Sequence, residues 1–137
     1  MVDRDLMLRK MAHLDTYLIQ LGAYAGLTEG DYRSDWKTQR IVDRTLHLVI
    51  ETCMDIADHV VADQRLRVPD TGAATFEILG EAGVLPQELA AALAKMVGFR
   101  DILVHDYAKL DPAIVVRALT TNLEDVRRFR AVVLTLR

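Results

Sequence analysis

Hydrophobic residues recur along most of the chain at intervals of four and three positions, the spacing that puts side chains on one face of an α-helix. The first such stripe consists of Met7, Met11, Leu14, Leu18, Leu21 and Ala25. Asp3 is placed to cap the start of this helix, and Gly26 stands where a glycine would end it. The residues at 27–33 are polar and include a glycine, so we predict a loop there.

A second stripe with the same spacing predicts a long helix that begins after Ser34 or Asp35 and ends near Asp63. Its apolar members are Val42, Leu46, Val49, Cys53, Ile56 and Val60. At 1.5 Å per residue this helix spans about 40 Å. A helix of that length sets the long axis of a helical bundle.

Two further helices are predicted in the middle of the chain. A short helix covers about 73–81 and is ended by Gly83. Pro86 then occupies a favourable first position for a long helix. The apolar seam of that helix consists of Leu89, Leu93, Met96, Leu103 and Tyr107.

The last helix begins where residues 109–112 break the periodicity, with Asp111 as its cap and Pro112 at its first position. Its stripe, which Asn122 interrupts, consists of Val115, Leu119, Val126, Phe129, Val133 and Leu136. Four long helices, one short helix and no strand-like alternation predict an all-α fold, an up-and-down four-helix bundle with an additional short helix. The length of 137 residues suits a single core, so we predict one domain over residues 1–137.

Composition and charge narrow the classes of protein. The chain is 51% apolar, with 17 Lys and Arg against 20 Asp and Glu and a formal net charge of −3, which is typical of a globular rather than a disordered chain. A mildly acidic chain lacks the overall positive charge of a non-specific nucleic-acid binder, so a polyanion would have to contact a local cluster of cations. The single Cys53 cannot form an intramolecular disulfide, and neither a signal-like segment nor a run of about 20 apolar residues is present. We therefore expect a cytoplasmic protein that does not cross a membrane.

Arg100 interrupts the apolar seam of the fourth long helix, at a position where an apolar residue is expected. A guanidinium is costly to bury without a partner. One interpretation is structural, with the stem of Arg100 packed on the bundle and its head reaching water or a carboxylate. The alternative is a functional site, because Asp101, His105 and Tyr107 follow within two turns. These four side chains offer a phosphate ligand, an orienting acid, a proton shuttle and a phenol.

Two histidines and two carboxylates are spaced four residues apart on the second long helix: His47, Glu51, Asp55 and His59. They could bind a divalent metal, but metal sites in bundles take inward ligands from several helices, and no Glu-x-x-His pair completes one here. We therefore favour a solvated or interfacial polar stripe and predict no metal site. Glu51 and Asp55 can instead face the helix that carries Arg100 and pair with it.

Basic residues at 4-3-4 spacing could form a stripe that guides RNA: Arg33, Lys37, Arg40 and Arg44. A second basic group near the C-terminus consists of Arg127, Arg128, Arg130 and Arg137. Because runs of charge are usually solvated and acidic residues lie nearby, neither group is assigned a role. The aromatic side chains of Tyr24, Tyr32 and Trp36 could stack on bases, but aromatic residues near helix ends more often pack, so they are assigned no role either.

The stretch from Arg100 to Tyr107, which reads R-D-I-L-V-H-D-Y, resembles the R-x4-H-x-Y signature of the HepT-like toxins, a family within the HEPN superfamily of small helical domains. The polar residue after the arginine, Asp101, fits the broader HEPN pattern. The opening amphipathic helix, the segment 51–59 and the G-E-A-G-V-L-P segment at 80–86 also look like that family. The resemblance covers most of the chain, and no position of the motif departs from the family pattern.

The resemblance implies a metal-independent endoribonuclease that works as a homodimer, with the motif helices of two protomers lining one composite cleft, and it implies no cofactor. Arg100 would hold the scissile phosphate of the RNA substrate or stabilise its developing charge. His105 would be the general acid or base in the attack of a ribose 2′-hydroxyl on the adjacent phosphate. Asp101 would orient His105 or Arg100.

The resemblance also implies a protein partner. In HepT-like toxins a minimal nucleotidyltransferase antitoxin attaches AMP to the tyrosine of the motif and silences the toxin, and the matching residue is Tyr107. The added negative charge beside Arg100 would block the cleft and compete for the guanidinium. The alternative is a non-catalytic binding or scaffold subunit of a nucleotidyltransferase complex, in which Arg100 and Tyr107 serve the interface. The net charge of −3 favours this alternative, whereas the presence of His105 beside Arg100 favours the enzyme.

Overall fold

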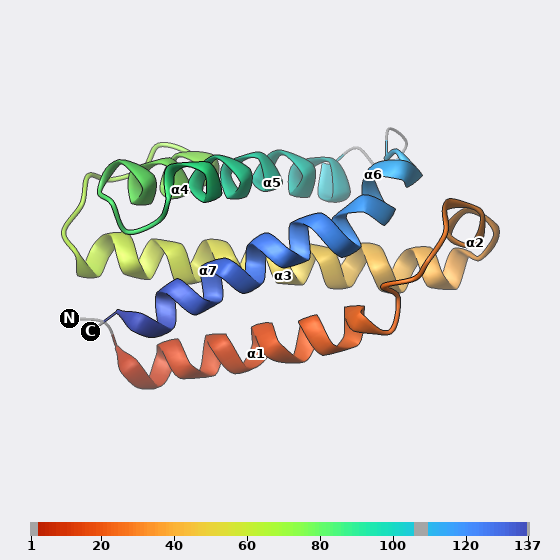
Figure 1. Cartoon of the computed structure of the whole chain (residues 1–137), viewed down its shortest axis with the longest axis horizontal. Coiled ribbons are helices and arrows are strands. Elements are labelled where there is room, and N and C mark those ends of the chain that lie inside the picture. The colour runs from red at the N-terminus through yellow and green to blue at the C-terminus, as the bar shows by residue number, and fades with distance from the viewer. Residues whose placement is uncertain (1–2, 106–109, 137) are drawn as a thin grey trace.

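The computed structural model describes residues 3–105 and 110–136, and every secondary-structure element in those ranges is a helix (Figure 1). The helices are α1 Arg4–Gly22, α2 Glu29–Ser34, α3 Trp36–Asp63, α4 Gly72–Glu81, α5 Gln87–His105, α6 Pro112–Arg117 and α7 Leu123–Thr135, with a π turn at Ala118–Asn122 between the last two. Within these ranges, no helix combines the length and the apolar composition that crossing a bilayer requires.

The four long helical segments run alternately up and down the molecule. The longest helix, α3, extends along its whole length, with α1 on one side and α5 on the other, while α7 crosses the bundle obliquely (Figure 1). The short helix α4 packs along α5. The end of α5 lies at the same end of the molecule as α2, α6 and the start of α3, whereas the start of α1 and the end of α7 lie at the other end. This arrangement confirms the predicted helical bundle.

Two of the predicted helix starts are confirmed in atomic detail. The side chain of Asp3 accepts a hydrogen bond from the backbone N–H of Leu6 at 3.1 Å, and Asp35 accepts one from Lys37 at 3.0 Å. The predicted end of the first helix is wrong, because α1 stops at Gly22 and not just before Gly26. The backbone turns instead over the next four residues, which leaves the side chain at position 25 exposed.

The loop predicted at 27–33 is also wrong in part, because α2 occupies most of it. The hydroxyl of Thr28 accepts a hydrogen bond from the N–H of Asp31 at 3.1 Å and so caps this helix. Tyr32 on α2 is buried, and its hydroxyl donates a 2.7 Å hydrogen bond to Oδ1 of Asp43 on α3. The threonine three positions before an acidic residue was the sequence signal for this short helix.

The interruption at Asn122 in the last predicted helix corresponds to the π turn. Asp111 caps the start of α6, as predicted, by accepting a 2.9 Å hydrogen bond from the N–H of Ala113, and Pro112 is the first helical residue. A π turn contains an extra residue relative to an α-helical turn. The stripe therefore passes to Leu123, which is 1% exposed and takes the core position that the α-helical spacing had given to Asn122.

The core is built from the predicted stripes. All six apolar residues of the α3 stripe are buried, and the rings of Phe76 on α4 and Phe129 on α7 meet edge to face at 5.6 Å between centroids. Cys53 is among the buried residues, and burial raises the pKa of its thiol. The apolar packing leaves Arg100 as the polar member of the α5 seam.

Candidate active site

Arg100, near the end of α5, is held between two carboxylates. Its Nε donates a 2.6 Å hydrogen bond to Oε1 of Glu51 on α3, and its Nη2 donates to the same oxygen. Its Nη1 donates to Oδ1 of the adjacent Asp101 at 2.8 Å. The side chains of Arg100 and Glu51 are 22% and 34% exposed, so the guanidinium lies at the edge of the core and within reach of solvent. Of the two predicted partners, Glu51 pairs with Arg100 and Asp55 does not.

Burial and pairing act in opposite directions on the charge of Arg100. Partial burial lowers the pKa of the guanidinium, while the hydrogen bonds and charges of Asp101 and Glu51 raise it, and the net result is a pKa above the ordinary value. The group therefore stays charged. A guanidinium carries five N–H donors. Within the described part of the chain, the contacts to Glu51 and Asp101 use three of them. The other two can donate to an oxyanion of a ligand.

His105 is the last residue of α5 and is exposed. Among the residues that the structure describes, it has no hydrogen bond to Arg100 or to Asp101, whose carboxylate contacts the guanidinium instead. The imidazole of His105 is exposed, five positions after Arg100 on the same helix. Tyr107, the predicted site of AMP attachment, lies outside the described residues.

A line of polar contacts continues from Arg100 along α3. Oε1 of Glu51 lies 3.3 Å from Nε2 of His47, and Nδ1 of His47 lies 3.0 Å from Nη1 of Arg44. The next carboxylate of the predicted polar stripe, Asp55, pairs with Lys10 on α1 at 3.4 Å. The two carboxylates of the stripe thus pair with different neighbouring helices, Glu51 with α5 and Asp55 with α1. In the described ranges, no three His, Cys, Asp or Glu side chains are grouped so that they could hold a metal ion.

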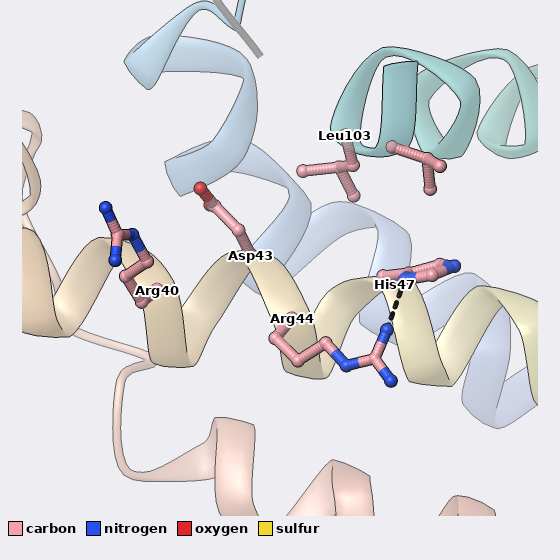
Figure 2. Close-up of a pocket in the computed structure, with 6 residues that line it drawn as sticks. Arg40, Asp43, Arg44, His47 and Leu103 are labelled. Carbon is pink, nitrogen blue, oxygen red and sulfur yellow. Dashed lines mark hydrogen bonds between the residues drawn. The ribbon is translucent and has the colours of Figure 1, made fainter. Parts of the chain in front are cut away.

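A cavity of about 310 Å³ lies between α3 and the end of α5. It is lined by Arg40, Asp43, Arg44, His47, Leu103 and Val104. Figure 2 shows the α3 members of this lining following one another along the helix, with Leu103 of α5 above them. Sequence analysis missed the cavity because two helices far apart in the chain form it. The sequence did indicate one wall of the cavity, because the spacing of Arg40 and Arg44 predicts a basic stripe on α3.

The structure separates the predicted basic stripe into three parts. First, Arg33 lies on α2, apart from the other three residues. Second, Nζ of Lys37 and Cζ of Arg40 lie 5.7 and 5.4 Å from the ring centroid of Trp36. Third, Arg44 lines the cavity, where Arg40 joins it. Trp36 is exposed, whereas Tyr32 is buried. The aromatic side chains predicted together therefore have different surroundings.

Comparison with known proteins extends the likeness beyond the motif. The family model described as ribonuclease HepT-like matches residues 14–133. The mRNA nuclease HepT of Shewanella oneidensis is 32% identical over 125 residues, which cover 91% of this chain and 93% of the relative. The tRNA nuclease HepT of Aphanizomenon flos-aquae is 32% identical over 124 residues, which cover 88% of this chain and 84% of the relative.

Solved structures agree with this likeness in three dimensions. The tri-AMPylated Shewanella oneidensis HEPN toxin in complex with MNT antitoxin superposes with a TM-score of 0.89 at 31% identity, covering 97% of this chain and 99% of that one. A toxin–antitoxin structure with AMP-PNP also gives a TM-score of 0.89, at 29% identity, covering 97% and 100%. The helical fold is thus the HEPN fold, and with the family match over residues 14–133 the chain belongs to the ribonuclease HepT-like family.

Proposed function

We propose that the chain is the ribonuclease toxin of a toxin–antitoxin pair and that it cleaves RNA without a metal ion. The observation that carries this proposal is the fixed, charged guanidinium of Arg100 together with the exposed imidazole of His105 five positions later on α5, at the positions of the R-x4-H-x-Y signature. The relatives at 32% identity are named as nucleases of mRNA and tRNA, which supports RNA as the substrate class.

The proposed reaction is an internal transfer of the phosphodiester. A base removes the proton of a ribose 2′-hydroxyl, and the 2′-oxygen attacks the adjacent phosphorus. The bond to the 5′-oxygen of the next nucleotide then breaks as an acid protonates that oxygen. Arg100, with two N–H groups not used by Glu51 or Asp101, donates to the phosphate oxygens as negative charge accumulates on them. Histidine serves as base or acid because imidazole exchanges a proton near neutral pH.

The site is proposed to be complete only in a homodimer. One chain brings one motif histidine, His105, whereas the reaction requires a base and an acid at the same time. Two motif helices facing each other across a two-fold axis would supply both groups. His105 lies at an exposed helix end, where a second copy can approach it.

The test of this function is RNA cleavage by the purified chain in excess EDTA, with intact mass used to verify that the protein carries no AMP. We expect cleavage at the same rate in EDTA and in Mg²⁺, from a protein that light scattering shows to be a dimer at micromolar concentration. An identical preparation from cells with the empty vector is the control for contaminating nucleases. Loss of cleavage in EDTA would contradict the metal-independent mechanism, and a monomer that cleaves would contradict the composite site. A dimer without AMP that leaves RNA intact would favour the non-catalytic subunit.

A nucleotidyltransferase partner is the second component of the proposal, which places both proteins in the cytoplasm together with RNA and ATP. The solved relatives include a tri-AMPylated HEPN toxin in complex with MNT antitoxin, which supports a partner of this kind. Tyr107, two residues after His105, is the proposed acceptor of AMP. A phosphodiester attached there would add negative charge to the motif and would compete with the phosphates of RNA for the positive charge of Arg100.

Co-expression with the cognate nucleotidyltransferase is expected to raise the intact mass of the chain by whole AMP units. The Tyr107→Phe variant lacks the hydroxyl that would form the bond to phosphorus, so its mass is expected to stay unchanged. The control variant Tyr17→Phe removes a hydroxyl from α1 and is expected to be modified like the parent chain. If Tyr107→Phe gains AMP to the same extent as the parent chain, the acceptor has been assigned to the wrong residue.

A further inference from the structure

The cavity between α3 and the end of α5 has a cationic wall that the proposed chemistry does not use. Arg40 and Arg44 contribute guanidinium groups, and the salt bridges of the described residues include neither of them. Among the described residues that line the cavity, Asp43 is the one carboxylate, and its Oδ1 accepts the hydrogen bond of Tyr32. Two guanidinium groups against one carboxylate give the cavity a positive charge, although the whole chain is acidic.

The two arginines are also restrained, which reduces the entropy lost when they bind a ligand. Nη1 of Arg44 lies 3.0 Å from Nδ1 of His47, the contact drawn in Figure 2. The guanidinium of Arg40 lies 5.4 Å from the ring centroid of Trp36, within the range of a cation–π contact. The cavity is therefore a preformed cationic surface.

The position of the cavity connects it with the candidate active site. Leu103 and Val104, which line it, directly precede His105 in the chain. On α3, the contacts from Arg44 through His47 to Glu51 lead to the guanidinium of Arg100. A ligand bound at Arg100 and His105 can thus continue along α3 into the cavity.

We propose that this cavity is a subsite for backbone phosphates of the RNA strand next to the scissile phosphate, with Arg40 and Arg44 as the phosphate ligands. This inference rests on the proposed ribonuclease function and adds the surface that holds the strand. Phosphates are the part of RNA that an arginine fork binds without reading the base. The subsite therefore contributes affinity and position along the strand, and not base preference.

The test is the binding of a fluorescently labelled single-stranded RNA whose riboses are all 2′-O-methylated, so that it lacks the attacking hydroxyl. Anisotropy in EDTA is measured for the parent chain, for Arg40→Gln/Arg44→Gln, and for the control Arg4→Gln/Arg9→Gln, which removes two exposed arginines from α1. Mass spectrometry verifies that no protein carries AMP, so the RNA is the source of phosphate. We expect the cavity variant to bind about tenfold or more weakly, with the salt slope smaller by about 1.4, or 0.7 per phosphate contact on a single strand.

With cleavable RNA, the cavity variant is expected to raise KM and to leave kcat within about twofold, as for an interaction made equally in the ground and transition states. The control variant is expected to behave like the parent chain in both assays. If the parent chain binds and cleaves RNA and the cavity variant equals the control, the subsite is overturned and the ribonuclease function stands. If the parent chain neither binds nor cleaves RNA, both proposals are overturned. Unchanged RNA binding with loss of the dimer in light scattering would assign the cavity to a protein interface and also overturn the subsite.

Discussion

Replacing His105 by alanine is expected to lower the rate of RNA cleavage by about 10²–10⁴-fold, the usual contribution of a general acid or base. In a homodimer the substitution removes both histidines of the composite site, so no second imidazole compensates. The folded structure is expected to persist, because His105 is exposed at the end of α5 and no hydrogen bond within the described residues depends on it. Single-turnover cleavage and thermal unfolding measure the two effects separately.

The matched control is His13→Ala, which removes another exposed histidine, from α1. It is expected to leave the rate of cleavage and its dependence on pH unchanged. A His105→Ala protein that cleaves at the parent rate would remove His105 from the mechanism.

Replacing Arg100 by alanine is expected to reduce cleavage by about 10²–10³-fold, because one preorganised donor to a developing oxyanion has an effect of this size. Arg100→Lys keeps the charge but loses the planar fork, so most of the activity is expected to be lost with it as well. Glu51→Gln keeps the shape of the partner and removes its charge. Because a small displacement of a catalytic group lowers rates by up to about 100-fold, we expect an intermediate loss of kcat with that variant.

Loss of Arg100 also has a structural consequence, which requires its own control. The ion pair with Glu51 is partly exposed, and its loss is expected to cost about 1–2 kcal/mol in the free energy of unfolding. Arg130 on α7 makes a similar pair with Asp15 on α1, with Nε–Oδ1 at 2.6 Å and Nη2–Oδ2 at 3.0 Å. Arg130→Ala is expected to lower stability to a comparable extent and to leave cleavage unchanged. If both variants lose cleavage equally, the effect of Arg100 is structural rather than catalytic.

The helices could be predicted from the sequence because their signals are local. The apolar stripe of α3 and the caps Asp3, Asp35 and Asp111 depend on residues within one or two turns, and the structure confirms each of them. The errors occurred where tertiary packing changes a local preference. α2 forms around the buried Tyr32, and at the π turn Leu123 takes the core position that the α-helical spacing had given to Asn122.

The candidate site was visible only in part. The signature from Arg100 to His105 is contiguous, so the sequence alone identified it and the resemblance that it carries. The partner of Arg100 was left open between Glu51 and Asp55, because the choice depends on how α3 is rotated about its axis and how far it is shifted along α5. The structure assigns Glu51 to Arg100 and Asp55 to Lys10 of α1.

The sequence by itself determined the helical class, most of the buried faces and the motif, since each is written in spacings of a few residues. The tertiary structure decided the carboxylate that holds Arg100 and the cationic cavity beside the motif, which Arg44 of α3 and Leu103 of α5 line together. Those features join side chains about 50 positions or more apart in the chain. Their contact is set by the packing of whole helices against one another, which no local pattern encodes.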